Sequence, residues 1–218
     1  LVVASARGWI APGFIDLQVN GALGHDFGVE PAAVAAVARW LPRTGVTAFL
    51  PTLITAPLSR LTAALARLGA AATAASAAVP LGVHLEGPYL NPAYRGAHVA
   101  EWLRPLDLPE LDELCAAGPV RLLTLAPELP GAPAAIAWLR ARGSVVSAGH
   151  SGADHVATLA AVAAGLTCGT HLFNAMAPFH HRAPGLVGAL LTEPGLHAGL
   201  IADGIHVHPA ALALAYRA

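Results

Sequence analysis

The chain has 218 residues, of which 56% are hydrophobic and 11% are charged, so it is long enough to bury one sizeable core and too apolar to be disordered. Its formal net charge of −1 excludes the basic surface that nucleic acid or anionic membranes would require, and we expect neither partner. All 12 basic residues are arginines, which excludes Schiff-base chemistry, a Walker-type phosphate lysine and a carboxylated lysine bridging two metals within these residues.

Short apolar runs alternate with alanine- and leucine-rich helical patterns along the chain. This alternation predicts repeated βα units around a parallel sheet, and we expect residues 1–218 to form one hydrolase barrel of about seven units. The predicted strands are Trp9 to Val19, Val46 to Thr52, Leu81 to Glu86, Val120 to Ala126, Ser144 to Gly149, Thr167 to Leu172 and His197 to Ala202.

The predicted helices begin near prolines and end near glycines, as is typical of helix boundaries. Pro31 opens a helix that ends before Gly45, and Pro57 opens an alanine-rich one. The stretch Leu61 to Pro80 contains Arg67 and several hydroxyl residues, so it predicts a helix and not a membrane span. Three further helical patterns are followed by Gly118, Gly143 and Gly165.

Polar side chains concentrate where the apolar strands end. Glu86 ends the third strand, His150 the fifth, His171 the sixth and Asp203 the seventh. Functional residues on so many successive strands favour a TIM-like (β/α)8 barrel over a doubly wound open sheet. Because the pattern stops one strand short and a missing strand leaves unpaired edges, we expect the natural protein to continue beyond Ala218. The absence of an initial Met likewise suggests a natural start upstream.

Glu86, His150 and His171 together form a ligand set typical of a catalytic zinc site. We therefore expect one divalent metal ion, zinc in the first place, although iron and manganese accept the same ligands. Gln18 and Asn20 end the first strand where two histidines would make a second site. Amides are weak zinc ligands, which favours one metal with Gln18 and Asn20 orienting water or the ligands, or a plain hydrogen-bonding role.

Several other histidines leave alternatives open. His84 shares a strand face with Glu86, and it is either a ligand or ligand partner, or a hydrogen-bonded interior histidine. His98 lies in a loop near the carboxylate, where it would polarise a substrate carbonyl, or it is an ordinary exposed histidine. We expect surface or local hydrogen-bonding roles for His25, His155 and His197.

A basic cluster follows the last two strands. Arginine and histidine beyond the strand ends suit an anionic group such as phosphate. The cluster comprises Asn174, His180, His181, Arg182, His206 and His208. Cys115 and Cys168 lie in unrelated contexts, which predicts buried free thiols and, by default, a cytoplasmic protein.

The motifs PGFIDLQVNG, HLEGPYLNPAYRGAH, AGHS, THLFNAM, HHRAPG and ADGIHVHP closely resemble the amidohydrolase superfamily, and within it the deacetylases of N-acetylated amino sugar phosphates. The likeness covers nearly the whole chain. It implies hydrolysis of the acetamide of N-acetylglucosamine 6-phosphate to glucosamine 6-phosphate and acetate, by a homodimer with one metal ion on Glu86, His150 and His171.

The same resemblance assigns roles to single residues. His98 would contact the acetamido carbonyl, and the sugar phosphate would be held by Asn174, the backbone at Ala175, Arg182 and His206. In the family the general base is an aspartate on the eighth strand, which we expect beyond Ala218, because Asp203 matches a different position. The family's small β-sandwich, formed from both termini, is missing as well, so we expect little turnover from these residues alone.

The sequence is also compatible with two other functions. One is a related amidohydrolase that acts on another N-acetylated amino sugar phosphate or on a cyclic amide. The other is a non-catalytic protein that binds a metal ion or a sugar phosphate without hydrolysing it.

Overall fold

One curved sheet of parallel strands forms the centre of the molecule. The structure is a computed structural model and describes residues 11–70 and 77–218. The strand order is β1-β4-β6-β7-β8-β9-β10, with β5 paired beside β4. The strands are β1 (Phe14–Val19), β4 (Val46–Ile54), β5 (Val79–Pro80), β6 (Val83–Glu86), β7 (Val120–Leu125), β8 (Val145–Ala148), β9 (Cys168–Gly169) and β10 (His197–Ala198).

Helices follow most of these strands, as expected of βα units. The α-helices are α1 (Val34–Trp40), α2 (Leu58–Gly69), α3 (Leu108–Ala117), α4 (Ala132–Ala141), α5 (His155–Ala164), α6 (Gly185–Thr192) and α7 (Pro209–Arg217). Short 3-10 helices are η1 (Pro31–Ala33), η2 (Leu41–Thr44), η3 (Pro92–Tyr94) and η4 (Ala100–Trp102). Within the described ranges, none of the helices combines the length and apolar character that crossing a bilayer requires.

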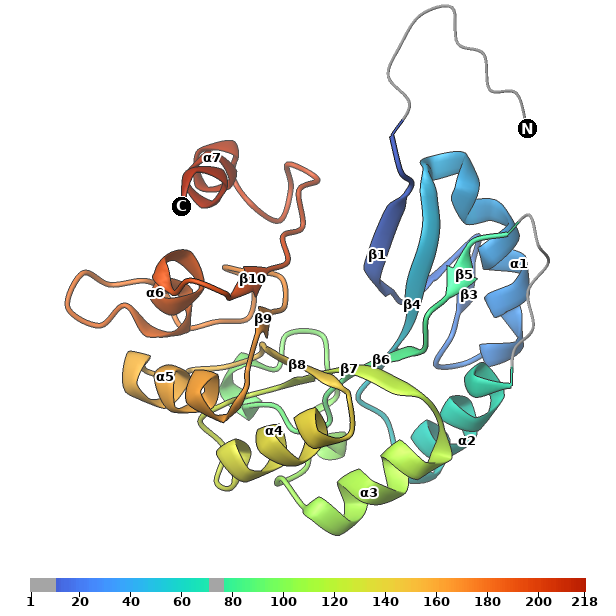
Figure 1. Ribbon diagram of the computed structural model, residues 1–218, viewed down its shortest axis with the longest axis horizontal. Helices are drawn as coiled ribbons and strands as arrows, with labels where there is room; N and C mark the ends of the chain where they lie inside the picture. The colour runs from blue at the N-terminus through green and yellow to red at the C-terminus, as the bar shows by residue number, and fades with distance from the viewer. Residues whose placement is uncertain (1–10, 71–76) are drawn as a thin grey trace, which may run out of the picture.

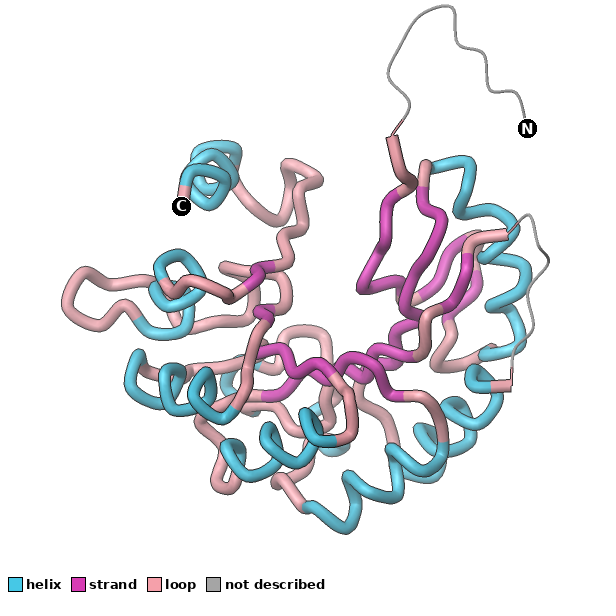
Figure 2. The backbone as a smooth tube through the Cα atoms, in the orientation of Figure 1, coloured by secondary structure: helices cyan, strands magenta, loops and turns pink. Residues whose placement is uncertain are grey.

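The sheet curves into an incomplete barrel. In Figure 1, helices α1 to α5 lie on the outer side of the curve, and β1 and β10 lie at its two ends. Figure 2 shows the same division, with strands along the inner side and helices outside them. This arrangement confirms the predicted α/β fold of the barrel type.

Strand register separates the core from the site. Leu85, Leu123 and Val146 are aligned across β6, β7 and β8 and are fully buried in the hydrophobic cluster. Because side chains alternate along a strand, the residues that follow them point to the opposite, inner face. That inner row begins with Glu86 and continues through Thr124 and Ser147.

Most of the predicted elements are confirmed, with shifted bounds. The first predicted strand begins at Phe14 and not at Trp9, which lies outside the described residues. The last strand ends at Ala198 and not at Ala202, because within the described chain β10 pairs only with the two-residue β9. Asp203 therefore lies in a loop and not at a strand end. The hairpin of β2 (Gly21–Ala22) and β3 (His25–Asp26) was not predicted.

Two further predictions were wrong in part. The alanine-rich helix does not reach Pro80, because α2 ends at Gly69 and the chain pairs with β4 as β5; residues 71–76 lie outside the described part. Cys115 and Cys168 are free, as expected, but half-buried, since one lies on the last turn of α3 and the other on a strand that lines an open cavity. Burial still raises the pKa of both thiols.

Candidate active site

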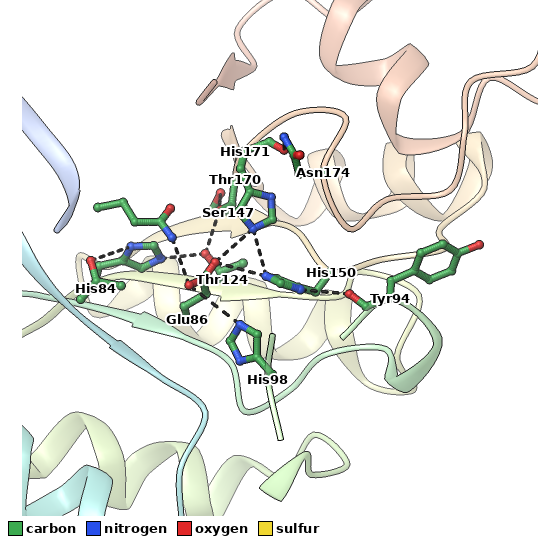
Figure 3. A network of polar contacts seen from close by, with 12 residues as sticks. His84, Glu86, Tyr94, His98, Thr124, Ser147, His150, Thr170, His171 and Asn174 are labelled. Carbon is green, nitrogen blue, oxygen red and sulfur yellow. Dashed lines mark hydrogen bonds and ion pairs between the residues drawn. The ribbon is translucent and has the colours of Figure 1, made fainter. Parts of the chain in front are cut away.

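Glu86, His150 and His171 converge at the carboxyl ends of β6, β8 and β9 (Figure 3). Oε1 of Glu86 lies 3.2 Å from Nε2 of His150 and 3.2 Å from Nε2 of His171. The two imidazole nitrogens are 3.0 Å apart. Glu86 and His150 are each only 4% exposed. Three ligand-type atoms from strands far apart in sequence therefore surround one point.

The donor set fits a metal ion. Tetrahedral zinc with donor distances of about 2.0–2.1 Å separates its ligand atoms by about 3.3 Å, close to the spacing observed here. Nδ1 of His150 lies 3.0 Å from the carbonyl oxygen of Tyr94. Because a carbonyl oxygen only accepts, this contact places the ring proton on Nδ1. In that tautomer the unprotonated Nε2 points toward the carboxylate of Glu86. Two lone pairs facing each other in this way favour a cation between them.

Electrostatics keeps the carboxylate charged. Burial would raise the pKa of Glu86, but the close approach of His150 and His171 outweighs that effect and holds the pKa well below its ordinary value. Glu86 is therefore an anion at neutral pH, as a metal ligand must be.

The two amides of the first strand differ in what they contact. Nε2 of Gln18 donates to Oε2 of Glu86 at 3.0 Å, so Gln18 binds the oxygen that does not face His150 and His171. The side chain of Asn20 is exposed, and its backbone carbonyl accepts from Phe27. Both residues line the same cavity. A role in orienting the ligands stays a prediction for Gln18, whereas Asn20 has no contact with the carboxylate.

His98 is brought to the site from the loop after β6. It is 3% exposed, so the alternative of an exposed loop histidine is wrong. Its Nε2 lies 3.9 Å from Oε2 of Glu86, and its ring is 4.4 Å from that of His150. Thr55 contacts Nδ1 through its hydroxyl at 2.7 Å. Burial lowers the pKa of His98 to about 4, helped by His150 and opposed by Glu86, so the ring is neutral at pH 7.

His84 lies below the ligand cluster in a chain of buried hydroxyls. Its Nε2 is 2.8 Å from Oγ1 of Thr124, and its Nδ1 is 3.4 Å from Oγ1 of Thr52. The chain continues from Thr124 to Thr170 at 2.8 Å and from Thr170 to Ser147 at 2.7 Å. Because both ring nitrogens have hydroxyl partners, the geometry favours an interior histidine over a ligand. Burial lowers the pKa of His84 to about 4.

The loops that carry the ligands have an unusual backbone. His150 and His171 have φ values of 50° and 38°, and Phe173 and Ala175 have 77° and 50°. L-residues rarely adopt this left-handed region, and such conformations persist where the surroundings fix them. Their concentration after β8 and β9 is typical of a functional site.

Of the residues predicted to bind phosphate, Arg182 and His206 are exposed, whereas Asn174 and Ala175 are half-buried. Arg182 is exposed, and its backbone N–H donates to Nδ1 of His180 at 3.2 Å. His206 is exposed and pairs with Asp203 at 2.6 Å. The backbone N–H groups of His206 and Ile205, together with the His206 ring, lower the pKa of Asp203 to about 2. Nδ2 of Asn174 lies 3.4 Å from the backbone carbonyls of His171 and Leu172.

The remaining histidines have local surroundings. His25 pairs with Glu30 at 2.8 Å and His197 is exposed, as expected for both. His155 is half-buried, and its Nδ1 has no hydrogen-bond partner in the described part of the chain. His208 accepts from the backbone N–H of Ala210 and so caps α7.

A cavity of about 870 Å³ opens beside the cluster on the inner side of the sheet. Its lining includes Gln18, His84, His171 and Asp203. This volume lies within the range of small-molecule sites.

Sequence reasoning missed Thr55, Thr124 and Glu128, which contact the site loops from other segments. Thr55 follows directly on β4, and Thr124 lies on β7, in register with Glu86. A threonine within the apolar run at the end of β7 was a signal for Thr124. Thr55 and Glu128 carried no comparable signal.

Comparisons with known proteins agree with this geometry. Residues 9–218 match the amidohydrolase family. The chain is 46% identical to N-acetylglucosamine-6-phosphate deacetylase of Mus musculus, over 96% of this chain and 54% of that protein. It is 43% identical to N-acetylgalactosamine-6-phosphate deacetylase of Escherichia coli O157:H7, over 94% of this chain and 55% of that protein. The chain thus spans about half the length of the curated relatives it matches.

Solved structures show the same relationship. The crystal structure of N-acetyl-D-glucosamine-6-phosphate deacetylase from Mycobacterium smegmatis superimposes with a TM-score of 0.85 at 38% identity, covering 94% of this chain and 55% of that one. A mutant of that enzyme in complex with N-acetyl-D-glucosamine-6-phosphate gives the same TM-score and covers 54% of its chain. The match to the family model over nearly the whole sequence, together with these structures, shows that the chain belongs to the amidohydrolase family.

Proposed function

We propose that the chain provides the metal-binding part of a deacetylase that hydrolyses the acetamide of N-acetylglucosamine 6-phosphate to glucosamine 6-phosphate and acetate. The observation that carries this proposal is the convergence of Glu86, His150 and His171, whose ligand atoms lie within 4.8 Å of one another. The names of the relatives support the substrate, since most of those compared are N-acetylglucosamine-6-phosphate deacetylases.

Glu86, His150 and His171 would hold one divalent ion, zinc in the first place. Such an ion supplies Lewis-acid chemistry and activates water near neutral pH. Gln18 would fix the orientation of Glu86 through the hydrogen bond to Oε2. The side chains of His171 and Glu86 are only 10% and 5% exposed, so the protein covers most of the ligand cluster.

His98 would bind the acetamido carbonyl. The ring is neutral, and the backbone N–H of Thr55 approaches Nδ1 to 3.4 Å. Because a backbone N–H only donates, this contact favours the tautomer with a proton on Nε2, the nitrogen that faces the cluster. A donor in that position would stabilise negative charge that develops on the carbonyl oxygen.

The phosphate would be held by Arg182, His206, Asn174 and the backbone at Ala175. Arg182 and His206 are exposed, and both offer the donors that bind phosphate oxygens. We further propose that the enzyme acts as a homodimer, which rests on the resemblance of the sequence motifs, and that it is cytoplasmic, which rests on its free thiols.

The test is metal content together with acetate release, measured on the natural polypeptide that contains this sequence. We expect about one ion per chain and acetate release from N-acetylglucosamine 6-phosphate, both lost in Glu86→Ala. His25→Gln, which changes an exposed histidine away from the cluster, serves as the matched control. Metal binding without acetate release would refute the deacetylase, and absence of metal would refute the ligand set.

A second candidate is a deacetylase of N-acetylgalactosamine 6-phosphate. It is favoured by the 43% identity to the Escherichia coli relative of that name. Comparing kcat/KM for the two epimers under the same conditions decides between the candidates, because only the orientation of one hydroxyl differs.

A further inference from the structure

Glu128 lies outside the ligand cluster but accepts three hydrogen bonds from the loops that form it. Its carboxylate follows β7 and is half-buried. Oε1 accepts from Nδ2 of Asn91 at 2.8 Å and from the backbone N–H of Gly152 at 2.6 Å. Oε2 accepts from Oγ of Ser151 at 2.7 Å. No cationic side chain in the described ranges forms an ion pair with Glu128, so the donors that contact its carboxylate are all neutral groups.

The three donors belong to two different site loops. Asn91 lies in the loop after β6 that leads to His98, whereas Ser151 and Gly152 directly follow His150. The two loops also meet through their backbones, since the N–H of Asn91 donates to the carbonyl of His150 at 3.0 Å. The hydrogen bonds of Glu128 therefore close a ring that joins the β6 loop, the β7 turn and the β8 loop.

The turn at His150 needs such support. Its φ of 50° is rare for a residue with a side chain, and it persists only where neighbouring contacts fix it. Ser151 is fully buried, so loss of the partner of its hydroxyl would leave a polar group unpaired. Hydrogen bonds to a carboxylate are stronger than those between neutral groups, which suits Glu128 to hold this turn.

We propose that Glu128 is a positioning residue that holds the backbone turn of His150 in the conformation that binds the metal ion. The inference rests on the proposed metal centre. Glu128 does not line the cavity beside the cluster, and it acts through Ser151 and Gly152. Without the carboxylate, the turn would relax toward common backbone conformations and Nε2 of His150 would leave the ligand set.

The experiment compares Glu128→Gln and Glu128→Ala with Glu113→Gln. Glu113 is an exposed glutamate on α3 whose side chain forms no hydrogen bond within the described part of the chain, so it serves as the matched control. Glu128→Gln keeps the size and one acceptor oxygen but replaces the acceptor of Ser151 by an amide nitrogen. Zinc affinity is measured by competition with a chelator, and amide hydrogen exchange is followed in the metal-free protein.

We expect Glu128→Ala to weaken zinc binding by about 10- to 100-fold, the range found when outer partners of metal ligands are removed. Glu128→Gln should show a smaller loss, and Glu113→Gln none. In Glu128→Gln, exchange at Ser151 and Gly152 should accelerate while exchange in β6, β7 and β8 stays as in the wild type. A purely structural role would not produce this local pattern.

The possible failures are distinguishable. If the wild-type protein binds no metal, the proposed function fails, and this inference fails with it. If the wild type binds zinc and Glu128→Gln and Glu128→Ala bind it equally well, the metal centre stands and the inference is wrong. Exchange that accelerates throughout the sheet in Glu128→Gln also overturns the inference. If Glu128→Ala does not fold, Glu128→Gln decides the matter.

Discussion

Gln18 donates a hydrogen bond from Nε2 to Oε2 of Glu86 at 3.0 Å, although β4 lies between their strands. The contact spans the inner side of the curved sheet, where side chains of non-neighbouring strands can meet. It occupies Oε2 and leaves Oε1 directed at His150 and His171. The first strand thus orients the carboxylate of Glu86 toward these two histidines.

Gln18→Leu should weaken metal binding by about 10-fold or more, because the carboxylate of Glu86 loses the donor that orients it. Asn20→Ala is the matched control, since the side chain of Asn20 is exposed and does not contact Glu86. Zinc affinity measured by chelator competition tests the prediction. Equal losses in both variants would show that the amides act together and that this hydrogen bond has no special role.

His98→Gln should lower kcat for acetate release by about 100-fold or more, the usual cost of losing one donor to a developing oxyanion. The metal content should stay unchanged, because Nε2 of His98 is 3.9 Å from Glu86 and His98 is not in the ligand set. Steady-state kinetics and metal analysis on the same preparation test this. Loss of the metal together with activity would contradict the assigned role.

Thr124→Val should destabilise the fold by about 1–3 kcal/mol, because it leaves Nε2 of the buried His84 without its hydrogen-bond partner. Valine has nearly the same shape as threonine, so packing is conserved. Thr62→Val on α2, whose hydroxyl bonds only the Ser59 carbonyl, is the control. Urea unfolding measures the difference, and equal midpoints for Thr124→Val and wild type would refute the network's contribution.

The metal-free protein should lose stability as the pH falls from 6.5 toward 4. Burial lowers the pKa of both His84 and His98 from 6.5 to about 4, so over this range the unfolded chain binds protons that the native protein does not. Stability is therefore fully present above pH 6.5 and decreases with acidification, by about 3 kcal/mol per histidine at the lower end. The lowered pKa of Glu86 acts in the same direction at still lower pH.

Urea midpoints in the presence of a chelator, at about pH 7.5 and about pH 5, measure this dependence. His84→Gln should make it shallower, because one of the two titrating groups is removed. A midpoint that is the same at both pH values would contradict the burial of neutral histidines.

The order of the strands and the residues of the candidate metal site were predictable from the sequence. Alternating apolar runs and helical patterns are local properties, and local periodicity carries the fold class. Glu86, His150 and His171 each stand where such a run ends, which allowed the ligand set to be predicted from three separate motifs. Strand ends were less accurate, as β9 and β10 show, because pairing partners determine where a strand stops.

The contacts around those ligands depended on the tertiary structure. Sequence left His84 and His98 with two alternatives each, and only burial and partners separated them: hydroxyls surround His84, while His98 faces the carboxylate. Glu128 is a common residue type in an ordinary turn, and its significance comes from donors 24 and 37 positions away. A hydrogen bond depends on distance in space and not in sequence, so the sequence determined which residues could serve as ligands, and the folded chain decided what holds them in place.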